Sequence, residues 1–250
     1  MLFLLCAIAW LLRWLALPAV VKWRWVEALL PLAAVATTLA SLARRLPAQN
    51  VLLAAALIAL IGGAVQTLGA TTGIPFGAYI YTDNLGQQIF HTLPWPMPLL
   101  WVVVILNARG VARLVLRPWR KTRNYGFQVI GLAGVLAVVF DLALEPFASK
   151  VNHYWIWQTP ETVLAWHTAP WANFLGWWLT SLLILVVVTP CLINKKPVRP
   201  AADYHPLVVW GMLNLIFAAG SAAHGLWSAV VFTVLANILV TVFAVRGARW

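Results

Sequence analysis

The chain has 250 residues, of which 63% are hydrophobic and 9% are charged, and it contains 16 tryptophans. This composition excludes an ordinary water-soluble domain, because too few polar side chains are present to cover its surface. The net charge of +11 would suit nucleic-acid binding, but its distribution indicates membrane topology instead, and no nucleic acid is expected as a partner. The two cysteines, Cys6 and Cys191, both fall in apolar stretches, which argues against a disulfide framework or a cysteine-based metal site.

Eight apolar stretches predict an all-α, polytopic bundle of membrane helices, because each has about 18 to 22 residues, enough to cross a hydrocarbon core. The first lacks a basic residue ahead of its apolar run, so we expect a span rather than a cleavable signal peptide. Only Gly225 separates the last two stretches, so seven spans remain an alternative. Residues 1–250 are expected to form a single integral membrane domain. The stretches are Leu2–Val21, Val26–Ala43, Val51–Ala70, Pro98–Leu116, Phe127–Phe147, Trp171–Ile193, Leu207–His224 and Leu226–Val245.

The 17 basic residues are distributed unevenly about these spans. With eight spans and both termini in the cytoplasm, cytoplasmic segments carry 13 of them, whereas the opposite side carries only Lys22, Arg24 and Lys150. Cytoplasmic loops are enriched in Lys and Arg, and a basic surface attracts anionic lipid. The pattern therefore predicts a multi-pass protein of the inner (cytoplasmic) membrane. The cytoplasmic set is Arg44, Arg45, Arg109, Arg113, Arg117, Arg120, Lys121, Arg123, Lys195, Lys196, Arg199, Arg246 and Arg249.

Two long connections, Thr71–Met97 and Ala148–Pro170, fall on the side that carries few charges. Loops of this length in compact domains are usually functional or disordered. Their many aromatic residues argue against disorder and are typical of segments at the level of the lipid headgroups. An aromatic belt without further function is the alternative. The aromatic residues include Tyr79, Tyr81, Phe90, Trp95, Tyr154, Trp155, Trp157 and Trp166.

Asp141 and Glu145 are four residues apart in an apolar stretch of a chain that has only six carboxylates. Residues with this spacing project from the same face of a helix, so we expect the two to share one pocket. A carboxyl group in a membrane helix costs roughly 2.5 to 3.5 kcal/mol and is by default a hypothesis for a functional site. The alternative is that Glu145, followed by Pro146, only marks the end of the helix.

Asp83, His153 and Asn173 are expected on the same side of the membrane as this pair. Three of the six carboxylates would then converge on one region lined by aromatic side chains. Pro146 disfavours helical geometry at Glu145 and frees carbonyl groups of the preceding turn. We therefore expect a broken helix there, which is tolerated where the backbone lines a cavity.

The expected environment suggests acid and base chemistry. Burial and a neighbouring carboxylate both disfavour ionisation, so one of the two acids should keep its proton near neutral pH. A protonated acid in an apolar pocket can attack an unactivated substrate while its partner serves as the base. Aromatic faces nearby could stabilise a developing carbocation, and a hydrophobic substrate reaches such a site from the bilayer.

At these residues the sequence resembles the membrane carotenoid 1,2-hydratases of the CruF type, often described simply as carotenoid biosynthesis proteins. The resemblance covers roughly residues 62–193, and four motifs occur in the same order. One departure is Glu145, because the family commonly has Asp before the proline. The motifs are GIPFGAYIYTDNLGQQIFHTLPWPMPLLW at Gly73–Trp101, FDLALEP at Phe140–Pro146, YWIWQ at Tyr154–Gln158 and PWANFLGWWLT at Pro170–Thr180.

The resemblance implies cofactor-free addition of water across the terminal C1–C2 double bond of an acyclic carotenoid end group, with other enzymes of carotenoid synthesis as candidate partners. Protonation of an isoprenoid double bond gives a tertiary cation, which an activated water can capture. Asp141 and Glu145 are the expected acid and base, in either order, and Asp83 is the third catalytic candidate. We expect Asn173 to orient water or a carboxyl group. The expected lining of the cation site is Tyr79, Tyr81, Trp155 and Trp157.

Other classes of protein remain as alternatives. A carotenoid cyclase or isomerase would begin with the same protonation but would exclude water. A transporter or pigment-binding protein could also use carboxylates within the membrane, although no internal repeat of the kind common in transporters is visible. Arg109 and Arg113 are expected to extend to the headgroups. The histidines show no metal-ligand spacing, and no metal or cofactor is expected.

Overall fold

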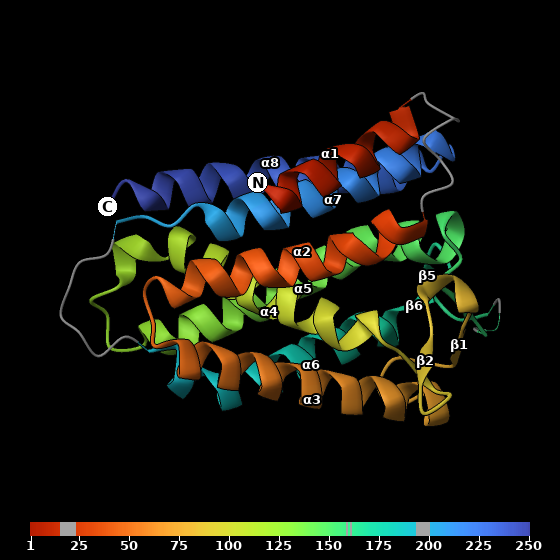
Figure 1. Ribbon diagram of the computed structural model, residues 1–250, viewed down its shortest axis with the longest axis horizontal. Coiled ribbons are helices and arrows are strands. Elements are labelled where there is room, and N and C mark those ends of the chain that lie inside the picture. Colours follow the sequence, from red (N-terminus) through yellow and green to blue (C-terminus); the bar gives the residue numbers. More distant parts are fainter. Residues whose placement is uncertain (16–23, 159, 161, 194–200) are drawn as a thin grey trace.

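The computed structural model describes residues 1–15, 24–158, 160, 162–193 and 201–250. In these residues the apolar stretches form eight α-helices of a polytopic bundle (Figure 1). They are α1 (Leu2–Leu15), α2 (Arg24–Ala43), α3 (Ala48–Thr72), α4 (Pro96–Val115), α5 (Tyr125–Pro146), α6 (Trp171–Val188), α7 (His205–Ala223) and α8 (Trp227–Ala248).

The helix boundaries follow from proline and glycine. Proline lacks a backbone N–H and is tolerated in the first turn of a helix, and α4 and α7 both have proline there. Helix α3 ends at Gly73, whose φ of 77° lies in the left-handed region that favours glycine. Gly225, with φ of 70°, separates α7 from α8, so the last two predicted spans are separate helices.

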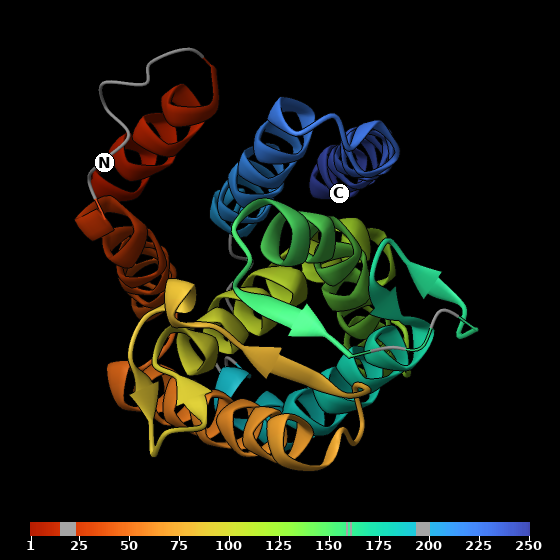
Figure 2. The same cartoon turned by 90° about the vertical axis from the view of Figure 1, so that its right-hand side faces the viewer.

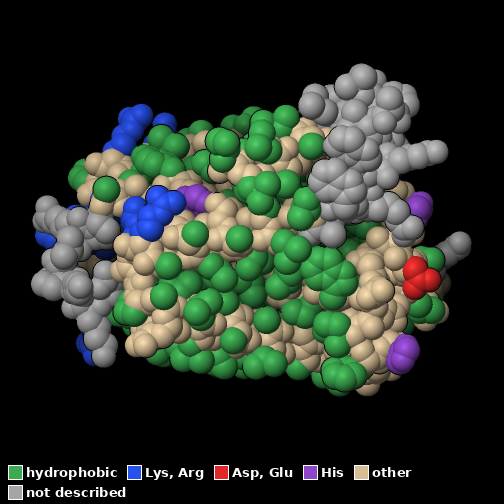
Figure 3. Space-filling view, in the orientation of Figure 1, with side chains coloured by type: hydrophobic (Ala, Val, Ile, Leu, Met, Phe, Trp, Pro, Cys, Tyr) green, Lys and Arg blue, Asp and Glu red, His purple; other side chains and the backbone are tan. Residues whose placement is uncertain are grey.

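Six of the described helices are long and apolar enough to cross a membrane. They are α3, α4, α5 with its extension, α6 with its extension, α7 and α8, whereas the described parts of α1 and α2 contain shorter apolar stretches. Residues 16–21 of the predicted first span lie outside the described residues, as do Lys22, Lys195, Lys196 and Arg199. The apolar side chains that cover the sides of the bundle suit contact with lipid (Figure 3).

Helix α4 lies in the centre of the bundle and contacts α2, α3, α5, α7 and α8 (Figure 2). Most of its side chains are buried, including Trp101, whose ring stacks on Trp177 of α6 with centroids 4.2 Å apart. Arg109 of α4 is only 7% exposed, so the expectation that it extends to the headgroups is wrong. Arg113, one turn later, is exposed.

The two long connections lie at one end of the bundle and contain short antiparallel strand pairs that the all-α expectation did not include (Figure 1). The strands in the first connection are β1 (Tyr79–Tyr81), β2 (Gln88–Ile89) and β3 (Leu93–Pro94), and those in the second are β4 (Trp155–Trp157), β5 (Ala165–Trp166) and β6 (Ala169–Pro170). Four short helical turns complete the described elements: η2 (Asp83–Leu85), η3 (Arg117–Trp119), η4 (Phe147–Val151) and η5 (Thr189–Leu192).

Candidate active site

The pairing of β1 with β4 joins the two long connections over the end of α5. Tyr79 lies opposite Trp157 and Tyr81 lies opposite Trp155, with Ile80 and Ile156 between them. Side chains alternate between the two faces of a strand. The four aromatic rings are buried or half-buried, while Ile80 and Ile156 are exposed. The aromatic rings therefore share the face that covers the protein interior.

Asp141 and Glu145 lie beneath this face, and both are almost completely buried, at 0% and 1% exposed. Asn173, at the start of α6, lies between them. Its Nδ2 group donates to Asp141 Oδ2 at 2.7 Å and to Glu145 Oε1 at 3.2 Å. The predicted same-face arrangement is present in the structure, and one amide connects the two carboxyl groups.

The other oxygen of Glu145 accepts two indole N–H groups from β4. Trp157 Nε1 donates to Oε2 at 2.9 Å, and Trp155 Nε1 donates to the same atom at 3.2 Å. Three N–H donors therefore converge on the Glu145 carboxyl group. Asp141 Oδ1, in contrast, is buried and has no hydrogen-bond partner among the described residues. The two carboxyl groups share the Asn173 amide as a donor but have different surroundings.

Two phenols and one glutamine line the far side of the pocket. The hydroxyl groups of Tyr79 and Tyr81 each donate to Gln66 Oε1 at 2.8 Å. Burial, which disfavours the charged phenolate, raises the pKa of both tyrosines above the ordinary range of a phenol. Gln66 was missed in the sequence, although a buried amide in the apolar run of α3 is the same kind of signal as Asp141 in α5.

Pro146 does not break the helix, which corrects the expectation from sequence. Helix α5 continues through Glu145 and Pro146 and passes into the π-helical turn η4. The carbonyl of Leu142, four residues before Pro146, is the group that a proline cannot bond. The indole of Trp166 donates to this carbonyl at 3.0 Å. A side chain of the second connection therefore takes the place of the missing donor, and the helix continues past Glu145.

A small chamber lies beside Glu145, with a volume of about 10 Å³. This is close to the space that one water molecule occupies. Gln66, Tyr79, Tyr81 and Asn173 line it together with Glu145, so a water there would have several polar neighbours. Asp141 is not part of the lining and lies behind Asn173. We call this space the carboxyl chamber; its remaining lining is Phe76, Met97, Trp155, Trp157 and Trp177.

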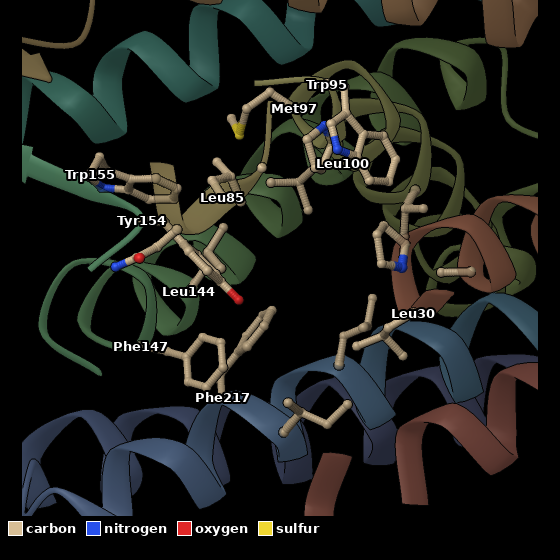
Figure 4. Close-up of a pocket in the computed structure, with 18 of the residues that line it drawn as sticks. Leu30, Leu85, Trp95, Met97, Leu100, Leu144, Phe147, Tyr154, Trp155 and Phe217 are labelled. Atoms are coloured by element: carbon tan, nitrogen blue, oxygen red, sulfur yellow. The ribbon is translucent and has the colours of Figure 1, made fainter. Parts of the chain in front are cut away.

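A larger cavity of about 220 Å³ lies on the other side of Met97 and Trp155, which line both spaces. Its walls come from α1, α2, α4, α5, α7 and the two long connections, and they are mainly apolar. Trp155 and Leu30 lie on opposite sides of it (Figure 4). We call it the apolar cavity; its lining includes Trp10, Leu30, Leu100, Leu144, Phe147 and Phe217.

Asp83 is not part of the carboxyl chamber. It lies in η2, its side chain is exposed, and it lines the apolar cavity. The structure therefore brings six of the predicted site residues together around the carboxyl chamber, joins Asp141 to them through Asn173, and places the third predicted catalytic carboxylate apart. His153 is exposed, and its Nδ1 atom lies 3.0 Å from the Ser149 carbonyl oxygen. Among the described residues, no group of three or more His, Cys, Asp or Glu side chains is placed to hold a metal ion.

The fold and the site define a polytopic helical membrane protein with a buried, amide-bridged carboxyl pair at one end of its bundle. The chain belongs to the carotenoid biosynthesis protein family, whose model matches residues 3–240. It is similar to bisanhydrobacterioruberin hydratase of Haloarcula japonica, with 26% identity over 176 residues. The matched stretch is 66% of this chain and 56% of that relative, so it spans little more than half of the relative's length. No solved structure matches the chain.

Proposed function

We propose that the protein is a carotenoid 1,2-hydratase that adds water across the terminal C1–C2 double bond of an acyclic carotenoid end group without a cofactor. Family membership and the name of the similar hydratase support carotenoid chemistry. The single observation that carries the proposal is the bridge from Asn173 to both Asp141 and Glu145. This bridge holds Asp141 close to Glu145, and Glu145 lines a chamber with room for one water.

The hydrogen bonds support one assignment of acid and base. Three of the four carboxyl oxygens accept N–H groups, which favours a negative charge on them. The fourth, Asp141 Oδ1, accepts none among the described residues. We therefore place on this oxygen the one proton that the carboxyl pair retains. In this proposal Asp141 is the general acid, and Glu145, which faces the carboxyl chamber, is the general base.

The proposed reaction has two proton transfers. Asp141 donates a proton to C2 of the double bond, and the electron pair of that bond leaves a tertiary cation at C1. A water in the carboxyl chamber then forms the C1–O bond while Glu145 removes one of its protons. The product is a tertiary alcohol. The proton on Glu145 returns to Asp141 and restores the starting state, so no oxidant or reductant is needed.

Aromatic faces around the carboxyl chamber support the cationic intermediate in this proposal. Tyr79 and Trp157 have ring centroids 5.1 Å apart, and Tyr81 and Trp155 have centroids 6.3 Å apart. The negative face of an aromatic ring attracts a cation. This attraction stabilises the cation by about 2 kcal/mol or more when both groups are removed from water. The polar, water-sized space beside Glu145 favours hydration over cyclisation, because a cyclase would have to keep water from the cation.

The apolar cavity supports a long hydrocarbon substrate that enters from the bilayer. Its volume of about 220 Å³ and apolar lining suit part of a polyene chain. The end group would enter the carboxyl chamber only when Met97 or Trp155 moves, because these side chains separate the two spaces. It would meet Asp141 there only when Asn173 also moves aside, because Asp141 does not line the chamber. We propose that the protein works in the cytoplasmic membrane with its arginine-rich end in the cytoplasm, where lipid and other enzymes of carotenoid synthesis are its neighbours.

Expression of the chain in a host that produces lycopene tests the proposal directly. Mass spectrometry of the pigments should show a gain of one or two waters, and nuclear magnetic resonance should place each hydroxyl group at C1. A product that is an isomer of lycopene, with unchanged mass, would contradict hydration and would indicate a cyclase or an isomerase. Unchanged pigment, with the protein present in the membrane, would favour transport or pigment binding.

A further inference from the structure

A cavity of different chemistry is formed by residues at the end of the bundle opposite the carboxyl pair. Figure 1 shows this end, where α2 leads into α3 and α4 ends, on the side away from the β-strands. It measures about 190 Å³ and is lined by the α2–α3 turn, α4, η3, η5 and the segments that begin α5 and α7. Basic side chains gather at this end (Figure 3). Five arginines and one carboxylate line what we call the arginine cavity: Arg45, Arg109, Arg113, Arg117, Arg120 and Asp203.

Arg109 is the most informative of these residues, because it is 7% exposed and cannot lose its charge. Its Nη2 group donates to the Leu192 carbonyl at 3.1 Å. Its Nε group is buried and has no hydrogen-bond partner among the described residues. A buried charge is costly unless an opposite charge or hydrogen bonds compensate it. Within the described chain, only a neutral carbonyl compensates this guanidinium.

The carboxylate of the arginine cavity is already engaged elsewhere. Asp203 Oδ2 lies 3.5 Å from Arg45 Nε, and Asp203 Oδ1 accepts the backbone N–H of His205 at 3.1 Å. The remaining described carboxylates, Asp83, Asp141 and Glu145, belong to the opposite end of the bundle. Asp203 is therefore engaged away from Arg109 and Arg113, and no other described carboxylate lines the cavity.

We propose that the arginine cavity binds a phosphate-bearing anion, either the headgroup of an anionic phospholipid or a free phosphate. Planar guanidinium groups bind phosphate oxygens with two parallel hydrogen bonds. Arg109 and Arg113 are one turn apart on α4 and can contact one anion together. Leu42, Leu106 and Leu114 line the same cavity and would contact the apolar part of a lipid. Basic pockets between membrane helices on the cytoplasmic side bind such headgroups.

The test uses the full chain, purified in an uncharged detergent, and needs no carotenoid. Native mass spectrometry would measure binding of dioleoylphosphatidylglycerol and dioleoylphosphatidylcholine, and thermal unfolding would be followed with and without inorganic phosphate. The variants are Arg109→Gln and Arg113→Gln. The control is Arg123→Gln, which removes the same charge from an exposed position in the connection between α4 and α5 but does not line the cavity.

We expect phosphatidylglycerol or phosphate to bind, phosphatidylcholine to bind more weakly, and Arg109→Gln and Arg113→Gln each to weaken anion binding by about tenfold. Arg123→Gln should change it by less than about twofold, as expected for a screened surface charge. Binding of the lipid alone identifies a headgroup site, and binding of phosphate alone identifies a soluble anion. Arg113 is exposed, so its variant keeps the test valid even if Arg109→Gln does not fold. Absence of binding, or equal binding by all three variants, would overturn the proposal.

Discussion

Tyr79 and Trp157 lie directly opposite each other across the β1–β4 pair, with their ring centroids 5.1 Å apart, and the indole of Trp157 also donates to Glu145. One side chain therefore has two separable properties, an aromatic face and an N–H donor. Both belong to a residue of the second long connection, which from the sequence alone could equally well belong to an aromatic belt.

Replacement of Trp157 separates these properties. Trp157→Leu removes both and should lower the rate of hydration by about tenfold or more, since 1.36 kcal/mol corresponds to one decade of rate. Trp157→Phe keeps a ring opposite Tyr79 and should retain intermediate activity. The measurement is product yield in a carotenoid-producing host at equal abundance of protein. Trp227→Leu, at an exposed position that begins α8, is the matched control, and equal activity of all variants would contradict a role for Trp157.

Asp141→Asn and Glu145→Gln should both abolish acid and base chemistry, with a loss of about a hundredfold or more, but they should differ in stability. An amide at position 141 resembles a protonated acid, so the fold should be little affected. At position 145 an amide replaces an acceptor of three N–H donors, and unsatisfied buried groups cost about 1–3 kcal/mol each. Thermal unfolding in detergent would measure the difference. Full activity in either variant would exclude that residue from catalysis.

Leu100→Trp tests whether the apolar cavity holds the substrate. Leu100 lines that cavity, so a larger side chain would fill part of it and should leave stability unchanged or raise it. The rate of hydration should fall by about tenfold because the polyene could no longer occupy the cavity. This loss corresponds to an increase of about 1.4 kcal/mol in the activation free energy. Leu60→Trp, which enlarges a side chain that is 68% exposed on α3, is the control. A Leu100→Trp protein with normal activity would place the substrate elsewhere.

The buried phenols predict a dependence of stability on alkaline pH. Because burial raises the pKa of Tyr79 and Tyr81 in the folded protein, folding favours their protonated form. Their contribution is complete below the ordinary phenol pKa of about 10 and is lost as the pH rises above it. Unfolding temperatures measured across this range should fall less steeply for Tyr81→Phe than for the unaltered chain. If the unfolding temperature of both proteins fell equally with pH, the pKa of Tyr81 would be the same in the folded and unfolded states.

The positions of the connections lead to a prediction about topology. Gln158 donates its backbone N–H to Ala78, so both long connections lie on one side of the membrane. Reporter fusions should place residues near Gln88 and Gln158 outside the cytoplasm and residues near Arg120 inside it, because cytoplasmic loops are rich in basic residues. A cytoplasmic signal at Gln88 would reverse the proposed orientation and with it the side from which water reaches Glu145.

The helices and the carboxyl pair could be predicted from sequence because both depend on local patterns. An apolar run sets a helix, and a spacing of four residues sets a shared face, so Asp141 and Glu145 were identified correctly as neighbours. Asn173 and the β4 tryptophans were also assigned to this neighbourhood from their side of the membrane. Their chemical roles remain predictions.

The contacts across the chain could not be predicted in the same way. Strands of two or three residues have no periodicity of their own, and the β1–β4 register depends on two connections that are far apart in sequence. Two residues on the same side of the membrane can still lie far apart from each other. The sequence places Asp83 on the same side as Glu145, but it cannot show that the two are separated. The continuous helix at Pro146 depends on Trp166, twenty residues further along the chain.

The π-helical turn η4 makes the arrangement of the site depend on the number of residues between Glu145 and Trp155. Its bond from the Asn152 N–H to the Phe147 carbonyl spans one residue more than an α-helical bond. Removal of one residue from this turn would restore an ordinary helix, yet it would shift the following strand by one position. Because strand side chains alternate, Ile156 would then face Glu145 and both tryptophans would face outward. In this segment the number of residues between Glu145 and Trp155 matters as much as their identity.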